Sequence, residues 1–467
     1  MGLGLKLNRE RNYMKKYLFG IMFVLSAASM LSACGLKDEV VEKAFNVDMK
    51  ELNNIAEDNA AEKEEAAAAG QQKTLKLFNG KGEVDAQIKE LAQKYKAETG
   101  VNVEVESAQS GVDVQATLKA YYLSDKMPDI FVCESSGFAN WEGLLVDLSD
   151  QAWAKDTEAE YVDKNYGTIG FPYATEAIGL IYNADLLSKA GIDPETLTGP
   201  ELMEKAFETL DSKKDQLGLT AVVGYCAEDE NLSWSTGNHI FGNYIDAGLD
   251  RSDTTYIDKI NNEHAIDRNR FLKFAEFIVL LQKYSDPDLL VTGTYDDQVK
   301  NFASGKYAFV TQGSWIGAVM TGNDAAEYNK AGNFKVGMLP YVFDKGVDTI
   351  LTNPPSWWAV LKEGNAEEAK AFLQWCAGDS GQKILVENAG FVSPFTSCKY
   401  VASDPFAPVV SAYIASGKTS NWHWMDMKEG IAANAFGKIF NEYARGEMDA
   451  EGFTSQIARA VKSYYEG

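Results

Sequence analysis

The feature that most restricts the fold of this chain is a strand, helix, strand pattern between residues 74 and 105. Residues 75–78 and 101–105 alternate apolar and polar side chains with the two-residue period of a strand. The intervening residues 83–99 have apolar side chains at helical spacing, and Gly100 follows as a helix end. A helix that connects two strands in this way joins them in parallel, so the pattern predicts a parallel sheet and an α/β fold.

Similar patterns continue along the chain. Apolar runs at 129–132 and 179–182 predict two further buried strands. The 467 residues exceed what one hydrophobic core usually serves, which favours two domains. No internal repeat is apparent, and this excludes solenoids and propellers. Helical spacing recurs at 114–122, 186–190, 201–210, 269–284, 296–303, 366–377, 381–388 and 430–444.

The N-terminal segment has the features of an export signal. Basic residues between Arg9 and Lys16 precede an uncharged apolar run that ends at Ala33, and this run is shorter than the about 20 residues that cross a bilayer. Its last residues, LSAC, resemble the lipobox of bacterial lipoproteins. We therefore expect residues 1–33 to be removed as a signal peptide and a lipid such as palmitate to modify Cys34. A buried helix that ends in a chance cysteine is the alternative, and Met14 is an alternative start to Met1.

Residues 34–73 are predicted to be an acidic spacer between this lipid and the folded part. Their Ala, Glu and Lys content, with one aromatic residue, cannot bury enough surface to fold alone. We expect the mature chain on the outer face of a cell membrane, of the Gram-positive type, held through its lipid only. The formal charge of −24 repels nucleic acid and anionic lipids, so polyanion partners are not expected.

The cysteines after Cys34 are too sparse for a disulfide framework. We expect small buried thiols at these positions, and if one disulfide forms, Cys376 with Cys398 is the pair we favour. They are Cys133, Cys226, Cys376 and Cys398.

Five segments in order give the chain a more specific resemblance. The run from Tyr166 to Leu187, YGTIGFPYATEAIGLIYNADLL, resembles the central signature of family 1 extracellular solute-binding proteins. These are receptors of carbohydrate ABC importers, similar to maltodextrin-binding protein. The resemblance covers residues 74–467, and the supporting segments are MPDI at 127–130, FASGKYAF at 302–309 with GSW at 313–315, VGMLP at 336–340, and 369–375 with GFVSP at 390–394.

The resemblance implies a two-lobed periplasmic-binding-protein-like fold with a central ligand cleft and a hinge. Because the chain crosses between lobes more than once, each lobe is discontinuous. The N-terminal lobe is expected to contain residues 74–174 and 358–415, and the C-terminal lobe 175–357 and 416–467. Pro172 and Tyr173 lie at the first expected crossing.

A sugar offers apolar C–H faces and a rim of hydroxyl groups, so its site needs flat aromatic rings together with carboxylates or amides. Trp315 follows Gly313 and matches a stacking tryptophan of the family, with a core position as the alternative. Glu176 matches a sugar-contacting glutamate. An isolated Glu is usually solvated, but its apolar neighbours make an open face difficult for this one.

Further aromatic residues are candidates for the same cleft. Trp422 and Trp424 fall where the family places another stacking ring; we expect one of them to face the cleft, with a slight preference for Trp424. Trp234 follows an acidic group at 228–230. Of the adjacent Trp357 and Trp358, at most one can reach the cleft, because neighbouring strand residues point in opposite directions. Tyr173 is included for its place at the crossing.

Two positions depart from maltodextrin-binding protein or have an equal alternative. The chain has Cys133, Glu134 and Ser135 where that protein has a tryptophan, and its acid–arginine pair is not evident, so a maltodextrin cargo is doubtful. Glu134 is nevertheless a candidate contact. Asn79 lies where the family often contacts sugar, and a loop cap explains it equally well.

The expected function is a monomeric receptor that captures a sugar, most simply an oligosaccharide, and delivers it to ABC permease subunits. Two rival functions stay open: a receptor for a polyamine or other non-sugar solute, and a lipid-anchored glycosidase. No nucleophile elbow or zinc motif is present, and the three histidines are widely spaced, so we expect no enzyme activity, cofactor or metal.

Overall fold

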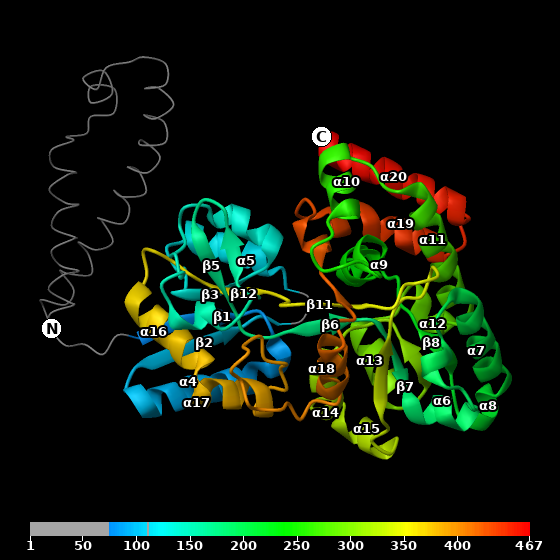
Figure 1. Cartoon of the computed structure of the whole chain (residues 1–467), viewed down its shortest axis with the longest axis horizontal. Coiled ribbons are helices and arrows are strands. Elements are labelled where there is room, and N and C mark those ends of the chain that lie inside the picture. The colour runs from blue at the N-terminus through cyan, green and yellow to red at the C-terminus, as the bar shows by residue number, and fades with distance from the viewer. Residues whose placement is uncertain (1–73, 110–111) are drawn as a thin grey trace, which may run out of the picture. The chain divides into compact units, whose positions relative to one another are not determined.

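The computed structural model describes residues 74–109 and 112–467. The predicted signal peptide, Cys34 and the spacer lie outside these residues. In the described part the strands form three sheets, and Figure 1 shows one strand-rich lobe at each side with β6 (Glu176–Ile178) and β11 (Ile350–Asn353) between them.

The first sheet consists of β1 (Thr74–Asn79), β2 (Asn102–Ser107), β3 (Ile130–Cys133), β4 (Tyr161–Asp163), β5 (Gly167–Pro172) and β12 (Trp357–Val360). Their order is β2-β1-β3-β12-β5-β4. β1 pairs in parallel with both β2 and β3, which confirms the parallel start predicted from the strand, helix, strand pattern. β12 is antiparallel to β3 and β5, so the sheet is mixed, because one strand returns from a distant part of the chain.

The other two sheets are smaller. The second is built from β7 (Leu180–Asn183), β8 (Ala221–Gly224), β9 (Tyr307–Val310) and β10 (Val336–Leu339), in the order β10-β7-β9-β8. The third joins β6 and β11 to β13 (Thr419–Ser420), in the order β13-β11-β6. Because β6 follows β5 after only residues 173–175, the third sheet lies where the chain passes from the first sheet to the second.

Helices surround these sheets. The α-helices are α4 (Asp85–Thr99), α5 (Val114–Leu123), α6 (Ala184–Ala190), α7 (Pro200–Ser212), α8 (Lys214–Leu217), α9 (Phe241–Asp246), α10 (Thr255–Glu263), α11 (Arg268–Lys283), α12 (Pro287–Leu290), α13 (Tyr295–Ala303), α14 (Ile316–Thr321), α15 (Ala325–Lys330), α16 (Ala366–Ala377), α17 (Asp379–Lys383), α18 (Ala407–Ala415), α19 (Gly437–Ala444) and α20 (Ala450–Glu466). The 3-10 helices are η1 (Gly82–Val84), η2 (Ser135–Trp141), η3 (Ala152–Lys155), η4 (Pro194–Thr196) and η7 (His423–Asp426), and the π-helices are η5 (Ser235–Ile240), η6 (Ile384–Asn388) and η8 (Ala432–Phe436).

Most predicted helices are present within a few residues of their expected ends, and two differ in type. The helix expected over 381–388 is α17 followed by the π-helix η6, and the helix expected over 430–444 is η8 followed by α19. Both segments have the apolar spacing of a helix. A π-helical turn differs from an α-helical one in that its hydrogen bonds join residues five apart instead of four, and the apolar spacing does not distinguish the two.

The helix α18 packs on the second sheet's core. Phe406 and Val410 belong to the apolar cluster that contains Ile181 of β7, and the hydroxyl of Tyr413 donates to the carbonyl of Met338 in β10 at 3.1 Å. Residues up to 415 were expected in the N-terminal lobe, so this helix argues for an earlier return to the C-terminal lobe.

The four cysteines in the described part are free thiols. Cys133, Cys226 and Cys376 are buried as expected, whereas Cys398 is half-buried. Across residues 74–109 and 112–467, no helix combines the length and apolar character needed to cross a membrane.

Candidate functional site

Five rings from distant parts of the chain meet in one place, and we call this group the ring cluster: Trp234, His239, Trp315, Trp422 and Trp424. The imidazole of His239 lies at its centre, with ring centroids 4.8 Å from Trp315, 5.1 Å from Trp424, 5.2 Å from Trp234 and 5.9 Å from Trp422. The structure therefore brings four of the predicted site tryptophans together. His239 was not among the predicted site residues, because a lone histidine carries no signal in the sequence.

Trp234 and His239 are presented by the π-helix η5. Trp234 immediately precedes it and His239 is its fifth residue. The carboxylate of Glu228 anchors the approach to this helix by accepting the backbone N–H groups of Glu230, Asn231 and Leu232 at 2.8–3.1 Å. The acidic group before Trp234 thus has a capping role, and the π-helical turn is a distortion that often occurs at functional sites.

Trp315 is held by a glycine and a buried amide chain. A Cβ atom on Gly313 would lie 2.0 Å from the Trp315 ring, so only glycine lets the ring take this position. The indole Nε1–H donates to Gln312 Oε1 at 3.2 Å, and Gln312 Nε2 donates to Gln298 Oε1 at 2.8 Å. Because both glutamines are buried, this chain of hydrogen bonds fixes the orientation of the Trp315 ring. Gly313 also bridges to Ile178 in β6, which brings Trp315 next to the strand that carries Glu176.

Trp422 and Trp424 both join the ring cluster, whereas the sequence favoured only one of them. Their ring centroids lie 5.8 Å apart. The sequence separates them because residues two apart share a face only in extended chain, but Trp422 lies before the 3-10 helix η7 with a non-helical backbone, and both rings reach His239. The Trp424 ring lies against Gly242, where an added Cβ would come within 2.7 Å of its Cδ1. Both indoles are buried, and neither Nε1–H has a hydrogen-bond partner in the described part of the chain.

A buried ion pair lies beside the rings. Glu176 of β6 is 5% exposed, and its Oε1 lies 2.6 Å from Nζ of Lys81, in the turn after β1. Lys81 also contacts Glu83 at 3.2 Å. Burial lowers the pKa of the Lys81 ammonium, but the carboxylates of Glu176 and Glu83 outweigh it and hold that pKa well above its usual value. Lys81 was not among the predicted site residues, because its partner Glu176 lies far away in the sequence.

The charge of Lys81 acts on the ring cluster. Burial, reinforced by this nearby positive charge, lowers the pKa of His239 to about 3. The imidazole is therefore neutral at physiological pH, and its Nδ1 is buried without a hydrogen-bond partner in the described part. A neutral imidazole surrounded by tryptophans suits an uncharged ligand better than an anion.

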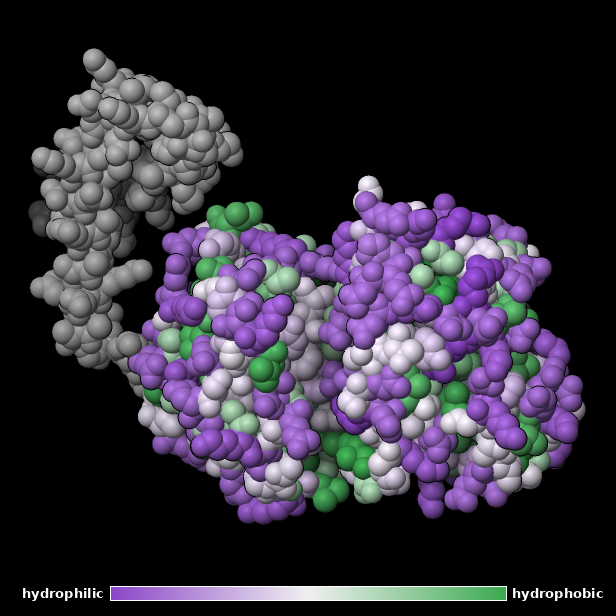
Figure 2. Space-filling view, turned by 45° about the horizontal axis from the view of Figure 1, so that its top comes forward, coloured by the Kyte–Doolittle hydropathy of each residue, from purple (hydrophilic) through white to green (hydrophobic). Residues whose placement is uncertain are grey.

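An open pocket of about 650 Å³ lies between the lobes, where the molecular surface is hollowed (Figure 2). The first-sheet side contributes Ser135, Phe138, Tyr161 and Tyr166, and the other side contributes Met425, Asp426, Met427 and Glu429. The two sides touch where Ser135 Oγ donates to Asp426 Oδ1 at 3.2 Å and Asn140 Nδ2 donates to Glu429 Oε2 at 3.3 Å.

Glu134 precedes this pocket at the end of β3. Its side chain is exposed to solvent, but the surrounding protein displaces much of its water, and the charges of Asp113 and Glu429 oppose ionisation. Together these effects outweigh Lys81 and raise the pKa of Glu134 to about 7. The carboxyl is thus available to a ligand in either protonation state near neutral pH.

Three predicted contacts are used within the protein. Tyr173 is 1% exposed, stacks on Trp358 and shares a 2.6 Å hydrogen bond with Ser356 Oγ. Trp357 is buried and its Nε1–H donates to the carbonyl of Ala159 at 2.7 Å. Asn79 is completely buried and caps the turn through Lys81 and Ser107. These contacts correspond to the core or loop-cap alternatives, so the ligand role of the three residues is still only a prediction.

A smaller pocket borders Trp315 and Glu176 on the other side. Its wall includes Asp404, a half-buried carboxyl whose Oδ1 accepts the N–H of Phe406 at 2.8 Å. Burial raises the pKa of Asp404 to about 7, and the charge of Glu176 adds to this effect.

Comparison with known proteins gives a family match. The family profile described as "Bacterial extracellular solute-binding protein" matches residues 90–409. Among curated relatives, the sn-glycerol-3-phosphate-binding periplasmic protein UgpB of Agrobacterium fabrum is 26% identical over 247 residues, which cover 51% of this chain and 52% of UgpB. The xylose/arabinose-binding protein XacG of Haloferax volcanii is 23% identical over 276 residues, covering 54% of each chain. The chain thus spans about half the length of the curated relatives it matches.

Solved structures share the two-lobed fold over most of the chain. The raffinose complex of RafE superposes with a TM-score of 0.66 at 18% identity and covers 84% of this chain and 100% of RafE. A sugar transporter protein of Bacillus licheniformis in complex with stachyose gives a TM-score of 0.64 at 18% identity, covering 84% of this chain and 99% of that one. At these identities the similarity establishes the fold.

Proposed function

Because this chain belongs to the bacterial extracellular solute-binding protein family, we propose that it is the receptor of an ABC importer that captures a neutral oligosaccharide. The observation that carries the proposal is the ring cluster, whose Trp315 lines the smaller pocket together with Glu176 of the Lys81–Glu176 ion pair.

In this proposal the tryptophan faces cover the C–H faces of sugar rings. The carboxylates of Glu176 and Glu134 accept hydrogen bonds from sugar hydroxyl groups. The indole N–H groups of Trp422 and Trp424, which have no partner in the described part of the chain, donate to hydroxyl oxygens. The loaded receptor then delivers its cargo to permease subunits.

The charges of the site support a neutral cargo over the phosphate that the UgpB relatives are named for. A phosphate dianion needs convergent cations. Lys81 is already engaged with two carboxylates, and the surrounding acidic groups include Glu134, Asp404 and Glu429. An anion bound at this site would therefore be repelled.

The same acidic surroundings make a polyamine the second candidate. Ammonium groups bind both to aromatic faces and to carboxylates. The site offers both, since Trp315 of the ring cluster lines one pocket with the carboxyls of Glu176 and Asp404. Spermidine is therefore the comparison that matters most in a ligand screen.

We further assign the lobes as the sequence predicted, with one change. Residues 74–174 and 358 onward form the N-terminal lobe, and the crossing back to the C-terminal lobe precedes α18, rather than following residue 415, because α18 packs on the second sheet's core. Closure takes place about residues 173–175 and 354–356, which connect the first sheet to the third.

The anchor proposed at Cys34 places this receptor on the outer face of the cell membrane, where its spacer raises the local concentration near the transporter. We expect Cys34→Ser to bind the same cargo but to be released from the membrane, as measured by fractionation. Retention of Cys34→Ser on membranes without lipid would refute the anchor. Monomeric behaviour and the lack of catalysis belong to the same proposal.

A thermal-shift screen of the full chain tests the cargo. We expect raffinose, stachyose or a chitin oligosaccharide to raise the melting temperature, because ligand that binds only the folded form stabilises it. Spermidine and sn-glycerol-3-phosphate should have no comparable effect. Stabilisation by spermidine alone would replace the sugar proposal with the polyamine one, and release of shorter sugars during incubation would indicate a glycosidase.

A further inference from the structure

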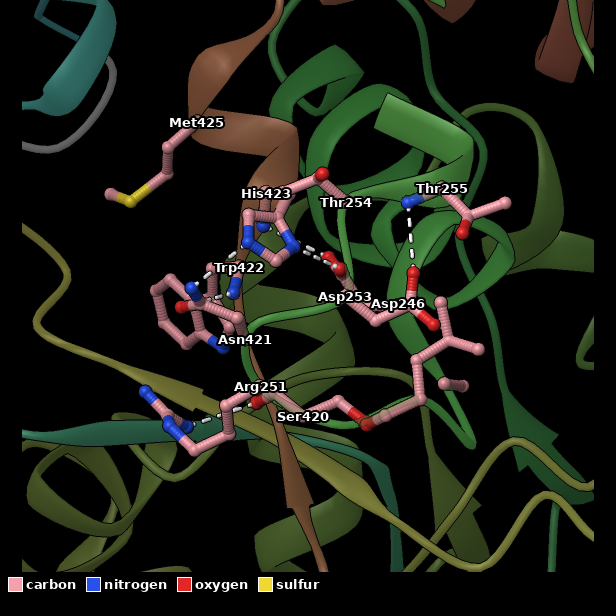
Figure 3. Close-up of polar contacts among 12 residues, drawn as sticks. Asp246, Arg251, Asp253, Thr254, Thr255, Ser420, Asn421, Trp422, His423 and Met425 are labelled. Carbon is pink, nitrogen blue, oxygen red and sulfur yellow. Dashed lines mark hydrogen bonds and ion pairs between the residues drawn. The ribbon is translucent and has the colours of Figure 1, made fainter. Parts of the chain in front are cut away.

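A buried histidine and aspartate hold the segment that carries Trp422 and Trp424. Asp246, the last residue of α9, accepts the backbone N–H of His423 on Oδ2 at 2.9 Å, and its Oδ1 lies 2.6 Å from His423 Nδ1 (Figure 3). Asp246 is 1% exposed and His423 7%. Since α9 directly follows the π-helix of His239, this contact ties the tryptophan segment to the element that supplies the centre of the ring cluster.

The hydrogen bonds of Asn421 determine which ring nitrogen of His423 carries the proton. The backbone N–H of Trp422 lies 2.9 Å from Asn421 Oδ1. Because that N–H can only donate, the amide orientation is set, and its Nδ2 faces His423 Nε2 at 3.1 Å. An amide nitrogen can only donate, so Nε2 must accept. His423 is therefore neutral in this arrangement, with its proton on Nδ1 and donated to Asp246.

The charged groups around His423 come from several elements. Asp246 belongs to α9, Arg251 and Asp253 to the loop after it, and Asp426 to η7. Arg251 is engaged with the carbonyls of Thr352 and Ser420. Burial lowers the pKa of His423, but the hydrogen bond and charge of Asp246, with Asp426, outweigh it and raise that pKa. Other contacts of η7, such as Ser135 and Asn261, are uncharged.

We propose that Asp246, His423 and Asn421 form a positioning relay that sets Trp422 and Trp424 in the binding site, an inference that rests on the proposed function. None of the three is proposed to touch the cargo. Each hydrogen bond of the relay has a fixed donor: Nδ1–H of His423 donates to Asp246, and Nδ2 of Asn421 donates to Nε2 of His423. A second proton on Nε2 would face the amide N–H of Asn421, so the amide would turn and release the N–H of Trp422.

The tautomer is the first test, and it needs no cargo. We expect nitrogen-15 NMR of the full chain at about pH 8 to report Nδ1 protonated and Nε2 unprotonated for His423, with the signal assigned by its loss in His423→Asn. The tautomer with the proton on Nε2 would overturn the relay.

Exchange of the two partners is the second test. Asp246→Asn still accepts the backbone N–H of His423, but its amide N–H faces Nδ1 and drives the proton to Nε2, against Asn421. We expect this variant to bind the best-bound of raffinose, stachyose and a chitin oligosaccharide at least about tenfold more weakly. Adding Asn421→Asp supplies an acceptor for Nε2–H, so the double variant should regain most of the affinity.

A merely structural contact would not behave in this way, because the double variant would then bind sugar no better than Asp246→Asn.

The relay also predicts that sugar affinity falls as the pH is lowered through the pKa of His423, and that Asn421→Asp alone removes this fall. His264→Asn is the matched control, since His264 lies outside the cluster at a positive φ that Asn adopts readily. A wild-type chain that binds none of the sugars would refute the proposed function, while the NMR result would still decide the relay.

Discussion

Two groups of aromatic side chains in this protein differ in ring geometry and in burial. In the first sheet, Trp358 stacks nearly parallel to Phe171, Tyr173 and Phe372, with interplanar angles of 12°, 16° and 25°, and we call these four residues the core stack. In the ring cluster, the four contacts of His239 have angles of 41–72°. Among the described residues, indole N–H groups without a hydrogen-bond partner occur in both groups, at Trp358 and at Trp422 and Trp424.

An unpartnered indole is therefore not by itself a mark of a binding site. The core stack is completely buried, whereas Trp234 and Trp315 are half-buried, and Trp315 borders a pocket that also includes Glu176 and Asp404. Tilted, partly open rings beside ionisable groups distinguish the ring cluster from the core stack. From this difference we expect the core stack to contribute stability, and we propose the ring cluster as the ligand site.

The largest effect is expected in the core stack. We expect Trp358→Ala to lower the free energy of unfolding by about 3–5 kcal/mol, because it removes a large buried ring and leaves a cavity. Urea unfolding measures this. A loss below about 1 kcal/mol would mean that the core stack does not support the fold as its burial indicates.

Trp315→Ala should have the opposite profile. We expect affinity for the oligosaccharide that stabilises the wild-type chain to fall by about 2–3 kcal/mol, as for a central aromatic contact. The free energy of unfolding should change much less than in Trp358→Ala, because Trp315 is only half-buried. Titration calorimetry and urea unfolding of both variants make the comparison. Retained affinity would make Trp315 a structural residue and remove the distinction between the two groups.

The ion pair is a further difference, since the core stack has no charges of its own. We expect Glu176→Gln to cost about 2 kcal/mol of stability, because it leaves the Lys81 ammonium buried with Glu83 as its remaining partner. Chemical unfolding is the measurement, and Glu83→Gln, at an exposed position, is the matched control. Equal effects of the two substitutions would show that Glu176 has no special role.

The smallest effect concerns pH. The pKa of Asp404 is raised to about 7, so the folded form binds a proton that the unfolded chain has lost. Stability from this group is present in acid and is lost as the pH rises from the ordinary aspartate range to about 7. We expect Asp404→Asn to be about 1–2 kcal/mol more stable than wild type at about pH 8, with no difference at about pH 4. A variant destabilised at both values would contradict this account.

The sequence predicted the parallel start of the first sheet, because a local period reveals each element and the helix between two strands determines their direction. It also identified the tryptophans that meet in the ring cluster. It did not identify His239 or Lys81, since their importance comes from neighbours far away in sequence, such as Trp422 and Glu176.

The direction of a side chain near a crossing between the lobes, toward the cleft or into the protein, was equally hard to predict. Tyr173 and Trp357 lie close to the crossings, yet the path of the chain turns both into the protein. For Trp422 and Trp424 the local backbone decides how the two rings lie relative to each other. Residues two apart share a face in extended chain but not within a helix, and here Trp422 lies outside the 3-10 helix η7 that contains Trp424, so both rings can contact His239.

The most direct test of the ring cluster as the ligand site is an indole N–H NMR titration of the full chain with the oligosaccharide that raises its melting temperature. Each signal is assigned by a Trp→Phe substitution. We expect the signals of Trp234, Trp315, Trp422 and Trp424 to shift on binding, while those of the buried Trp153 and Trp358 stay in place. Saturating sugar that leaves all four ring-cluster signals unmoved would contradict the central claim.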